Sequence, residues 1–358
     1  MTIAHFCNYY ETKLFAELFE KLSYEKKIEQ HVFFPYYKKL NQFPQVGRGF
    51  SLYVKKSVPN IFRHFFILRA LWTYLIFSRD LIKINFDVIH CHSFFNDGIL
   101  GLFCKWRFKK KLVCSFRNAD LQMLKKKIWL YPFYLLIKSQ ADQIIFISNA
   151  MKSKLPGLNG IVIPNGIDEL FYQDQQIKKI NPRSKLKIIF IGRLIKRKKV
   201  DIVLNYYIRN QEKLELTVVG DCEPLSTWGN KQLRKIQKNK RIIYYSSLSK
   251  NEVKKELDKN QIFVMTSLNE TFGIVYIEAM ARGLPIVYSK GTGVYKMFSK
   301  GIGAYVTNST YKNLSLAIDN ILSDYENISR NCLKESKKFR WPNIIGSYHE
   351  LYQNLVKK

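Results

Sequence analysis

Short apolar runs alternate with amphipathic stretches along the whole chain. The runs are rich in β-branched and aromatic residues and have the length of buried strands. They form two series, the first at 2–6, 31–34, 88–92, 111–116, 143–148 and 160–164, and the second at 187–192, 215–220, 242–245, 262–266, 285–288 and 304–306. Helical spacing of apolar residues predicts helices between them, as at 13–22, 200–210 and 272–282. Strands separated by helices predict an α/β protein with doubly wound parallel sheets.

The two series of strands are separated by a polar, loop-like segment at 174–184. A chain of 358 residues is also too long for one compact core. We therefore expect two Rossmann-like domains, at 1–168 and 169–338. Open parallel sheets bind ligands beyond the carboxyl ends of their strands, so we expect the two domains to face a shared cleft.

The composition is that of a globular protein, with 47% hydrophobic and 24% charged residues. The six cysteines form no C-x-x-C pair, which argues against zinc ribbons and thioredoxin-like redox sites. Scattered thiols and a start without a readable secretory signal favour a reducing, cytoplasmic setting. The most apolar region, 61–82, is interrupted by Arg63, Arg69 and Arg79, so we expect an amphipathic surface helix rather than a transmembrane one.

The chain is strongly basic, with 59 Lys and Arg against 28 Asp and Glu, a formal charge of +31. This excess predicts an anionic partner: a phosphate-rich ligand, a nucleic acid or an acidic membrane surface. Residues 40–138 hold 17 basic and 4 acidic side chains, a net +13. A solvated surface explains any single lysine, but the interleaved aromatics favour an acidic membrane or lipid phosphate: Phe62, Phe65, Phe66, Trp72, Trp106, Trp129, Tyr131 and Phe133.

The densest motif runs from Ser267 to Pro285, where a strand is followed by a glycine turn and a helix. The first N–H groups of a helix and its dipole favour an anion such as a pyrophosphate. Glu270 stands just before the helix and Glu278 within it. Eight helical residues span about 12 Å. The two carboxylates can therefore accept hydrogen bonds from the two ends of a nucleotide sugar, one from the transferred sugar and one from the ribose.

This E-x7-E motif and its order among other segments resemble the retaining glycosyltransferases of family 4 (group 1), which have the GT-B fold. Residues 190–201, FIGRLIKRKKVD, resemble the family's G-R-L-x-x-x-K-G-x-D, and 163–168, IPNGID, resemble its P-N-G-x-D. Segments 87–92, 115–120 and 146–150 are similar to landmarks of the family's first domain. The resemblance covers nearly the full length and implies that a helix at 339–358 packs back on the first domain.

The resemblance implies that Arg193 and Lys198, which follow the strand-ending Gly192, hold the donor pyrophosphate. Two fixed cations would stabilise the charge that builds on a leaving diphosphate without a metal. The alternative is that both belong to a solvated basic loop.

By the same resemblance, Glu270 contacts the donor sugar and Glu278 the ribose. The backbone N–H groups of Phe272, Gly273 and Ile274 would meet phosphate or sugar. No nucleophile is named, and we expect no cofactor beyond the donor substrate, a UDP-, GDP- or other nucleotide sugar.

On the acceptor side, Arg117 stands where the family commonly has histidine and is followed by Asn118 and Asp120. Arg117 is a candidate for an acceptor phosphate and Asp120 for the acceptor hydroxyl proton, although an Arg117–Asp120 ion pair is equally open. The resemblance also assigns His92 to the acceptor cleft and Asn165 to substrate binding.

Two departures from the family pattern concern glycines. Residues 7–11, CNYYE, replace a common Gly-Gly turn, and Lys199 stands where glycine is usual.

The predicted strand residues His90 and His92 face one side of the sheet, but the sequence shows no third ligand, so we predict no metal site. A further glycine turn, Gly291-Thr-Gly293, resembles one near the family's donor site, although a lone G-x-G is weak by itself.

These observations predict a retaining, metal-independent glycosyltransferase. It would transfer a sugar to a polyprenyl-pyrophosphate-linked saccharide in capsule or O-antigen assembly, as a peripheral protein on the inner membrane face. The alternatives are an epimerase or phosphorylase of the same architecture, or a non-catalytic polyanion- or membrane-binding protein. No RNP, KH or helix-turn-helix pattern supports a nucleic-acid partner.

Overall fold

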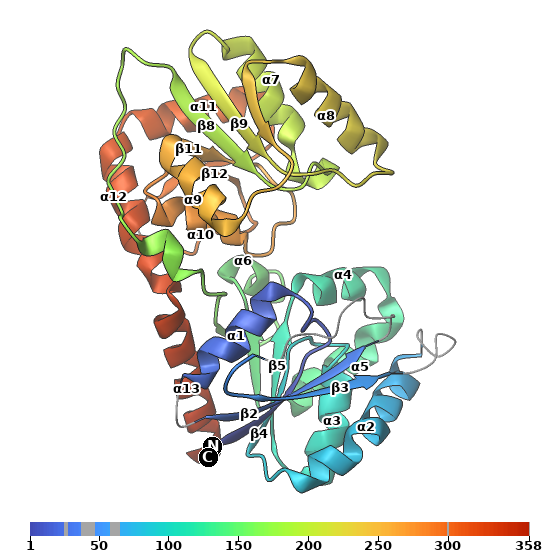
Figure 1. The fold of residues 1–358 in the computed structure, drawn as a ribbon. Coiled ribbons are helices and arrows are strands. Elements are labelled where there is room, and N and C mark those ends of the chain that lie inside the picture. Colours follow the sequence, from blue (N-terminus) through green and yellow to red (C-terminus); the bar gives the residue numbers. More distant parts are fainter. Residues whose placement is uncertain (25–27, 37–46, 58–64, 299–300, 358) are drawn as a thin grey trace. The chain divides into compact units, whose positions relative to one another are not determined.

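The computed structural model describes residues 1–24, 28–36, 47–57, 65–298 and 301–357, which form two compact units (Figure 1). The first comprises Met1–Ile147, Met151–Pro164 and Pro342–Lys358, and the second Ser148–Ala150 and Asn165–Trp341. Residues 165–168, expected in the first domain, group with the second unit. Ile167 forms a β-bridge with Arg340, and Gly166 packs so closely on the Trp341 ring that a Cβ would lie 2.5 Å from it.

Seven parallel strands form the described sheet of the first unit, in the order β3-β2-β1-β4-β5-β6-β7. Their bounds are β1 (Thr2–Phe6), β2 (Glu29–Tyr36), β3 (Ser51–Lys56), β4 (Val88–Cys91), β5 (Lys111–Phe116), β6 (Gln143–Phe146) and β7 (Ile161–Val162). All but β3 were predicted. β3 is a half-exposed edge strand ending in two lysines, so it lacks the apolar pattern of a buried strand.

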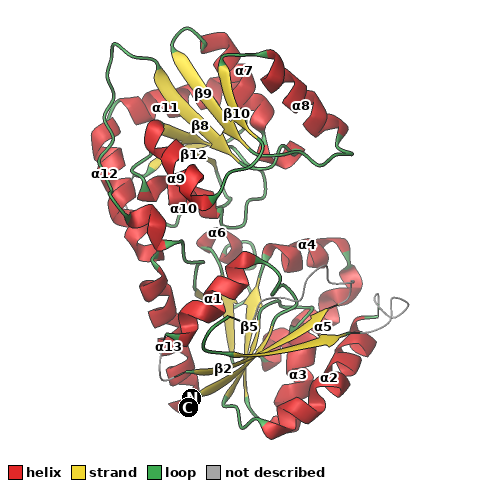
Figure 2. Ribbon diagram, in the orientation of Figure 1, coloured by secondary structure: helices red, strands yellow, loops and turns green. Residues whose placement is uncertain are grey.

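Helices cover both faces of this sheet (Figure 2). The helical segments are α1 (Lys13–Ser23), α2 (Phe66–Lys83), α3 (Gly98–Phe108), α4 (Asn118–Lys126), η2 (Ile128–Leu130), α5 (Tyr131–Gln140), α6 (Asn149–Lys152) and α13 (Trp341–Lys357). α1 and α13 contact the strand face that carries His5 and His90. α2 packs against α3, and α3 against α5 and the other face. Of the helices that the structure describes, none is long and apolar enough to cross a membrane.

The second unit has a described sheet of six parallel strands, in the order β10-β9-β8-β11-β12-β13. The strands are β8 (Leu186–Ile191), β9 (Leu214–Val219), β10 (Ile242–Tyr245), β11 (Ile262–Val264), β12 (Ile286–Ser289) and β13 (Gly303–Val306). The helical segments are η3 (Glu169–Tyr172), η4 (Lys196–Lys198), α7 (Val200–Asn210), α8 (Thr227–Lys238), α9 (Lys250–Lys259), α10 (Ile274–Ala281), α11 (Tyr311–Leu322), α12 (Tyr325–Ser336) and η5 (Lys337–Phe339). The prediction of two doubly wound parallel sheets is confirmed.

Both sheets have the strand order of a dinucleotide-binding fold, which fixes where a ligand can bind. The order reverses between β1 and β4 in the first unit and between β8 and β11 in the second. At such a switch point the loops after the two central strands diverge and leave a crevice beyond the carboxyl ends. The motifs at 190–201 and 267–285 follow β8 and β11, so the fold brings them to one switch point.

Candidate active site

The loops after β8 and β11 are joined by their backbones in the second unit. The carbonyl oxygen of Arg197 accepts the Leu268 N–H at 2.7 Å, and it shares the single Ser267 hydroxyl proton, at 3.3 Å, with Glu270 Oε2, at 3.2 Å. These bonds hold the basic segment 196–198 against the segment that leads to Glu270. Two motifs more than sixty residues apart in sequence therefore form one site.

At this junction Glu270 lies in a cluster of cations. One carboxylate oxygen, Oε2, lies 2.5 Å from Lys198 Nζ and 3.6 Å from Arg197 Nη1, and accepts the Ser267 hydroxyl at 3.2 Å. The side chains of Lys198 and Glu270 are each only 12% exposed. Arg197 was not singled out in the sequence, where it is one of four consecutive basic residues.

The cations keep the Glu270 carboxylate ionised. Burial by itself would raise the pKa of Glu270, but Lys198, Arg197 and the Ser267 hydroxyl outweigh it and hold that pKa below its usual value. Burial also lowers the pKa of Lys198, against the attraction of Glu270. We take the pair as ionised because the carboxylate has three favourable partners.

Glycines shape the entry to α10. Gly273 precedes the helix with φ of 78°, and a Cβ there would lie 2.5 Å from the Tyr276 ring. The Gly293 N–H donates to the Glu270 carbonyl oxygen at 2.8 Å, so the turn at 291–293 also packs on this site. The left-handed φ and the closeness of the Tyr276 ring require glycine here, and the backbone enters α10 directly after the segment that carries Glu270.

The other residues predicted for this site lie around the cluster. Arg193 is largely exposed, and its Nη1 lies 3.4 Å from Glu223 Oε1. It is near enough to Lys198 to lower the pKa of that ammonium. Glu278 lies half-buried within α10, and the Phe272 side chain is buried, with its ring 5.6 Å from that of Phe339.

The backbone requires a glycine conformation at Lys199 but not at Gly192. A Cβ on Gly192 would meet its nearest neighbours at ordinary contact distances, 3.5 Å and more. Lys199 has φ of 57° and ψ of 36°, a left-handed conformation that explains why glycine is usual there.

In the first unit, Asp120 has a carboxylate that is fully enclosed. Oδ1 accepts the Phe94 and Phe95 N–H groups, both at 3.1 Å, and Oδ2 accepts the Arg117 N–H at 2.9 Å. Burial raises the pKa of Asp120 to about 6, although the three N–H donors oppose this. Through these hydrogen bonds Asp120 connects the loop after β4 to the start of α4, which is a structural role.

Arg117 and Asp120 are joined through the backbone of Arg117 rather than through its guanidinium. The guanidinium lies 4.4 Å from the centre of the Phe15 ring, and its Nε donates to the His92 carbonyl oxygen at 2.9 Å. Asn118 is the first residue of α4, and Asn165 lies half-buried at the start of the long segment of the second unit.

Three buried histidines lie together under α1 and α13. His5 Nδ1 and His92 Nε2 are 3.1 Å apart, and His90 contacts the Tyr352 hydroxyl at 2.6 Å and the Ser115 hydroxyl at 3.0 Å. The His92 ring is fully buried and packs on Phe15 and Phe19, so it does not line an open surface.

His5 is the third imidazole that sequence reasoning did not find, and one ring nitrogen from each of the three lies within 4.8 Å of the other two. Burial lowers the pKa of each, and to about 3 for His5. Both nitrogens of His90 have hydrogen-bond partners, which argues against a metal ligand there, whereas His5 Nε2 and His92 Nδ1 are buried with no hydrogen-bond partner among the described residues.

The loop after β1 is held by side chains in place of the family's glycines. Asn8 donates to the Asp97 carboxylate, which also accepts the Ser93 hydroxyl at 2.9 Å. Asn96 donates to the Tyr9 hydroxyl at 3.3 Å. Burial raises the pKa of Asp97 to about 7. Sequence reasoning missed Asp97, because only the fold places it beside a loop some ninety residues away.

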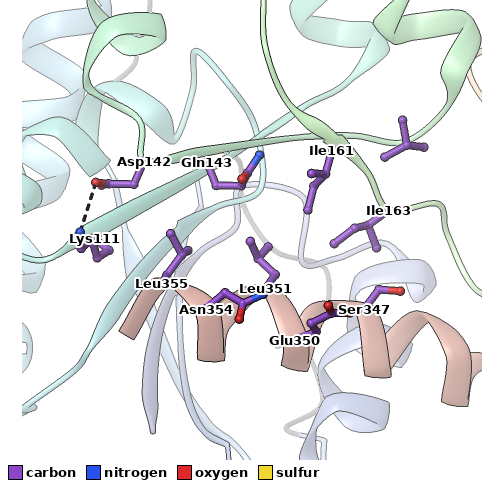
Figure 3. A pocket seen from close by; sticks show the side chains of 11 residues that line it. Lys111, Asp142, Gln143, Ile161, Ile163, Ser347, Glu350, Leu351, Asn354 and Leu355 are labelled. Carbon is purple, nitrogen blue, oxygen red and sulfur yellow. Dashed lines mark ion pairs between the residues drawn. The ribbon is translucent and has the colours of Figure 1, made fainter. Parts of the chain in front are cut away.

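A separate cavity of about 440 Å³ lies between α13 and the ends of three strands in the first unit (Figure 3). Lys111, Gln143 and Ile161, which begin β5, β6 and β7, line it, and Lys111 lies 4.0 Å from Asp142. These are the amino ends of the strands. The cavity is therefore at the edge opposite the switch point and is not part of the candidate site.

Comparison with known families gives a match in each half of the chain. Residues 172–339 match the model "Glycosyl transferases group 1", and residues 16–169 match "Glycosyltransferase Family 4". Together the two matched ranges cover both units.

Individual relatives are distant but extend over nearly the whole chain. An uncharacterized 41.2 kDa protein in the cps region of Klebsiella pneumoniae is 25% identical over 95% of this chain and 96% of its own length. Sucrose-phosphate synthase from Thermosynechococcus elongatus has a similar structure, with a TM-score of 0.77, 17% identity and 99% of each chain covered. Anabaena HepE in complex with UDP and glucose has a TM-score of 0.69, 17% identity, and 99% of this chain and 100% of that chain covered.

Proposed function

The chain is a family 4 glycosyltransferase with a GT-B fold, and from this premise we propose that it transfers a sugar from a nucleotide diphosphate donor bound in its second unit. The observation that carries the proposal is the cluster of Lys198 and Arg197 around Glu270, next to the start of α10 and at the switch point of the sheet. Transfer proceeds with retention and without a metal ion. Membership of this family sets aside the epimerase and the non-catalytic binding protein.

In this proposal the charges of the second unit act on the leaving diphosphate. Cleavage of the bond between sugar and phosphate builds negative charge, which Lys198, Arg193 and the first N–H groups of α10 stabilise. Loss of one such contact typically costs about 3–4 kcal/mol in the transition state. Glu270 accepts hydrogen bonds from the donor sugar, and Glu278 from the ribose.

We propose a polyprenyl-pyrophosphate-linked saccharide of surface polysaccharide assembly as the acceptor. The relative in a cps region supports the polysaccharide part, and the complex of HepE with UDP and glucose supports a UDP-sugar as the first donor to test. Arg117 is the candidate for the acceptor phosphate, because its guanidinium lies over an aromatic ring and uses Nε alone for the His92 carbonyl.

The first unit has a surface that suits an anionic lipid membrane. α2 buries Ala70, Thr73, Phe77 and Leu81 on one side and exposes a second set: Ile67, Leu68, Leu71, Trp72 and Leu75. A run of three lysines ends at Lys127. The exposed residues Ile128, Trp129 and Tyr131 follow it, and Ile128 is 87% exposed. Both sets belong to the side of the unit covered by α2, α3 and α5.

Exposed aromatic side chains can insert into the membrane interface, and the basic side chains beside them are attracted to acidic headgroups. The attraction contributes roughly 1 kcal/mol for each cation near the membrane surface. Residues 40–46 and 58–64 of the predicted region, which include Phe62 and Arg63, and the side chain of Phe66 lie outside the described part. We propose that the protein is peripheral on the inner face of the cell membrane.

The donor proposal is tested by the thermal stabilisation of the protein with UDP, GDP, ADP and dTDP. We expect one nucleotide to raise the melting temperature of the wild type and not of Arg193→Ala or Glu278→Ala. Lys196→Ala is the matched control, since it removes an exposed charge from the same loop. If no nucleotide shifts the wild type, or if all three variants respond like it, the assigned donor site is wrong.

The membrane proposal is tested by flotation with phosphatidylglycerol-containing vesicles at rising salt. Trp72→Ser with Leu71→Ser should weaken binding, while Leu225→Ser, at a 97% exposed leucine of the second unit, should not. Binding that is indifferent to salt would refute electrostatic docking. Equal binding of all variants would refute the assignment to α2.

A further inference from the structure

Arg197 shares the Glu270 carboxylate with Lys198. Both cations approach the same oxygen, Oε2, Lys198 Nζ at 2.5 Å and Arg197 Nη1 at 3.6 Å. The Arg197 side chain is 40% exposed, whereas that of Lys198 is 12% exposed. Lys198 is thus the inner partner of the carboxylate, and Arg197 the outer one.

The proposed function places two demands on Lys198. Its ammonium must reach the donor diphosphate, yet in this structure it is the closest partner of Glu270. If Lys198 turned to the phosphates and Glu270 had no other cation, a largely buried carboxylate would lose most of its compensation. Its pKa would rise toward the protonated form, which is a poorer acceptor for sugar hydroxyls.

Arg197 is fixed so that it can meet this need. Its own carbonyl oxygen accepts the Leu268 N–H at 2.7 Å and the Ser267 hydroxyl at 3.3 Å, so its backbone is tied to the segment that leads to Glu270. A guanidinium is always charged and reaches the carboxylate from the solvent side. The Arg197 guanidinium can therefore stay paired with the Glu270 carboxylate when the Lys198 ammonium moves away from it.

We propose that Arg197 is a positioning residue that keeps Glu270 ionised and oriented toward the donor sugar while Lys198 engages the diphosphate. The inference rests on the proposed function. Arg197 acts through Glu270 rather than on the phosphates. Loss of the Arg197 guanidinium should therefore lower the rate of sugar transfer or donor hydrolysis more than it lowers the affinity for the nucleotide.

The first test is a double-mutant cycle of Arg197→Gln and Glu270→Gln, read as melting temperature between pH 3 and 8. The folded-state pKa of Glu270 is lowered below its ordinary 4.5, so its ion-pair stabilisation is fully present above that value and is lost as pH falls through the folded-state pKa. We expect the two substitutions to be non-additive at pH 7.5 and still at pH 4.5, with the coupling reduced at pH 3. Lys196→Gln with Glu270→Gln is the control cycle and should be additive. Additive behaviour of Arg197→Gln at pH 7.5 would overturn the pairing.

The second test separates positioning from phosphate binding. Titration calorimetry should give a UDP dissociation constant for Arg197→Gln within about threefold of that of Lys196→Gln. With the UDP-sugar that the wild type uses, donor hydrolysis or transfer should fall by roughly three- to tenfold in kcat. The acid limb of its pH profile should move to higher pH, because Glu270 is then protonated more readily. Arg197→Lys should restore part of both effects.

Each contrary result has a distinct meaning. A tenfold or greater loss of UDP affinity in Arg197→Gln would make Arg197 a phosphate ligand and overturn the proposal. An acid limb and kcat equal to those of Lys196→Gln would also overturn it. If the wild type binds no nucleotide, the proposed function fails and this inference with it, while the cycle still shows whether the ion pair exists.

Discussion

Replacement of Asp120 by asparagine should remove a pH-dependent part of the stability of the first unit. The carboxyl is fully buried, and burial raises its pKa from an ordinary 3.8 to about 6. The folded state therefore holds this proton more tightly than the unfolded state. The stabilisation that results is fully present below pH of about 4 and is lost as pH rises through about 6. Asparagine does not titrate and lacks this dependence.

The size of the effect follows from the two pKa values. They differ by about two, and at 1.36 kcal/mol for each pH unit this corresponds to about 3 kcal/mol between pH 4 and pH 8. A second cost is independent of pH, because the amide –NH₂ of asparagine replaces the oxygen that accepts the Arg117 N–H. An unsatisfied buried N–H costs about 1–3 kcal/mol. Asp120→Asn should thus be less stable than wild type by the pH-independent cost at pH 8, and this deficit should grow by about 2 kcal/mol as pH falls to 4.5.

The assay is urea unfolding from pH 4.5 to 8, followed by tryptophan fluorescence. Three of the five tryptophans, Trp72, Trp106 and Trp129, belong to the first unit, so the signal is weighted toward it. Asp97→Asn is the companion variant and should change in the same direction, since burial raises the pKa of Asp97 to about 7.

A constant difference between wild type and Asp120→Asn at every pH would refute this reasoning. If instead Asp120→Asn abolished transfer and left the stability profile of the wild type intact, Asp120 would return to the role of proton acceptor for the acceptor hydroxyl.

Three further outcomes are expected. Lys199→Gly should raise the stability of the second unit by up to about 1 kcal/mol in thermal unfolding, because a left-handed residue loses its strain, whereas Lys199→Val should lower it. Tyr352→Phe should cost about 1–2 kcal/mol in urea unfolding, because His90 loses a buried hydrogen bond. Transfer should survive EDTA, and metal analysis should find no stoichiometric ion in spite of the cluster of His5, His90 and His92; activity restored only by a metal would contradict this.

The arrangement of elements was largely predictable from the sequence. The helical spacing of apolar residues over ten or eleven positions is a local signal, as is a run of three to six residues rich in β-branched and aromatic side chains. The glycine before α10 is a local requirement of its backbone. The family motifs also lie on such local signals, so the segments around Arg193, Lys198, Glu270 and Glu278 were found at once. The edge strand β3 was missed because it is half-exposed and charged, and so has no local signal of burial.

The roles of individual polar residues were decided only by the tertiary structure. Asp120 has the sequence context of a site residue, but three backbone N–H groups from two loops enclose its carboxylate. Arg197 is one of four consecutive basic residues, and only the pairing of β8 with β11 brings it to Glu270.

The same holds for His5, whose partner His92 lies 87 residues away, directly after β4, and for Asp97, which meets Asn8 across two loops. The physical reason is range. Backbone conformation and the period of burial depend on neighbours within a few residues, whereas the charge state and the partners of a buried polar group depend on whichever distant segments the fold brings within 3–4 Å of it. The sequence alone therefore determined the sheets, the helices and the family. The tertiary structure decided which distant polar residues meet, as Arg197 meets Glu270, and which are enclosed by backbone N–H groups, as Asp120 is.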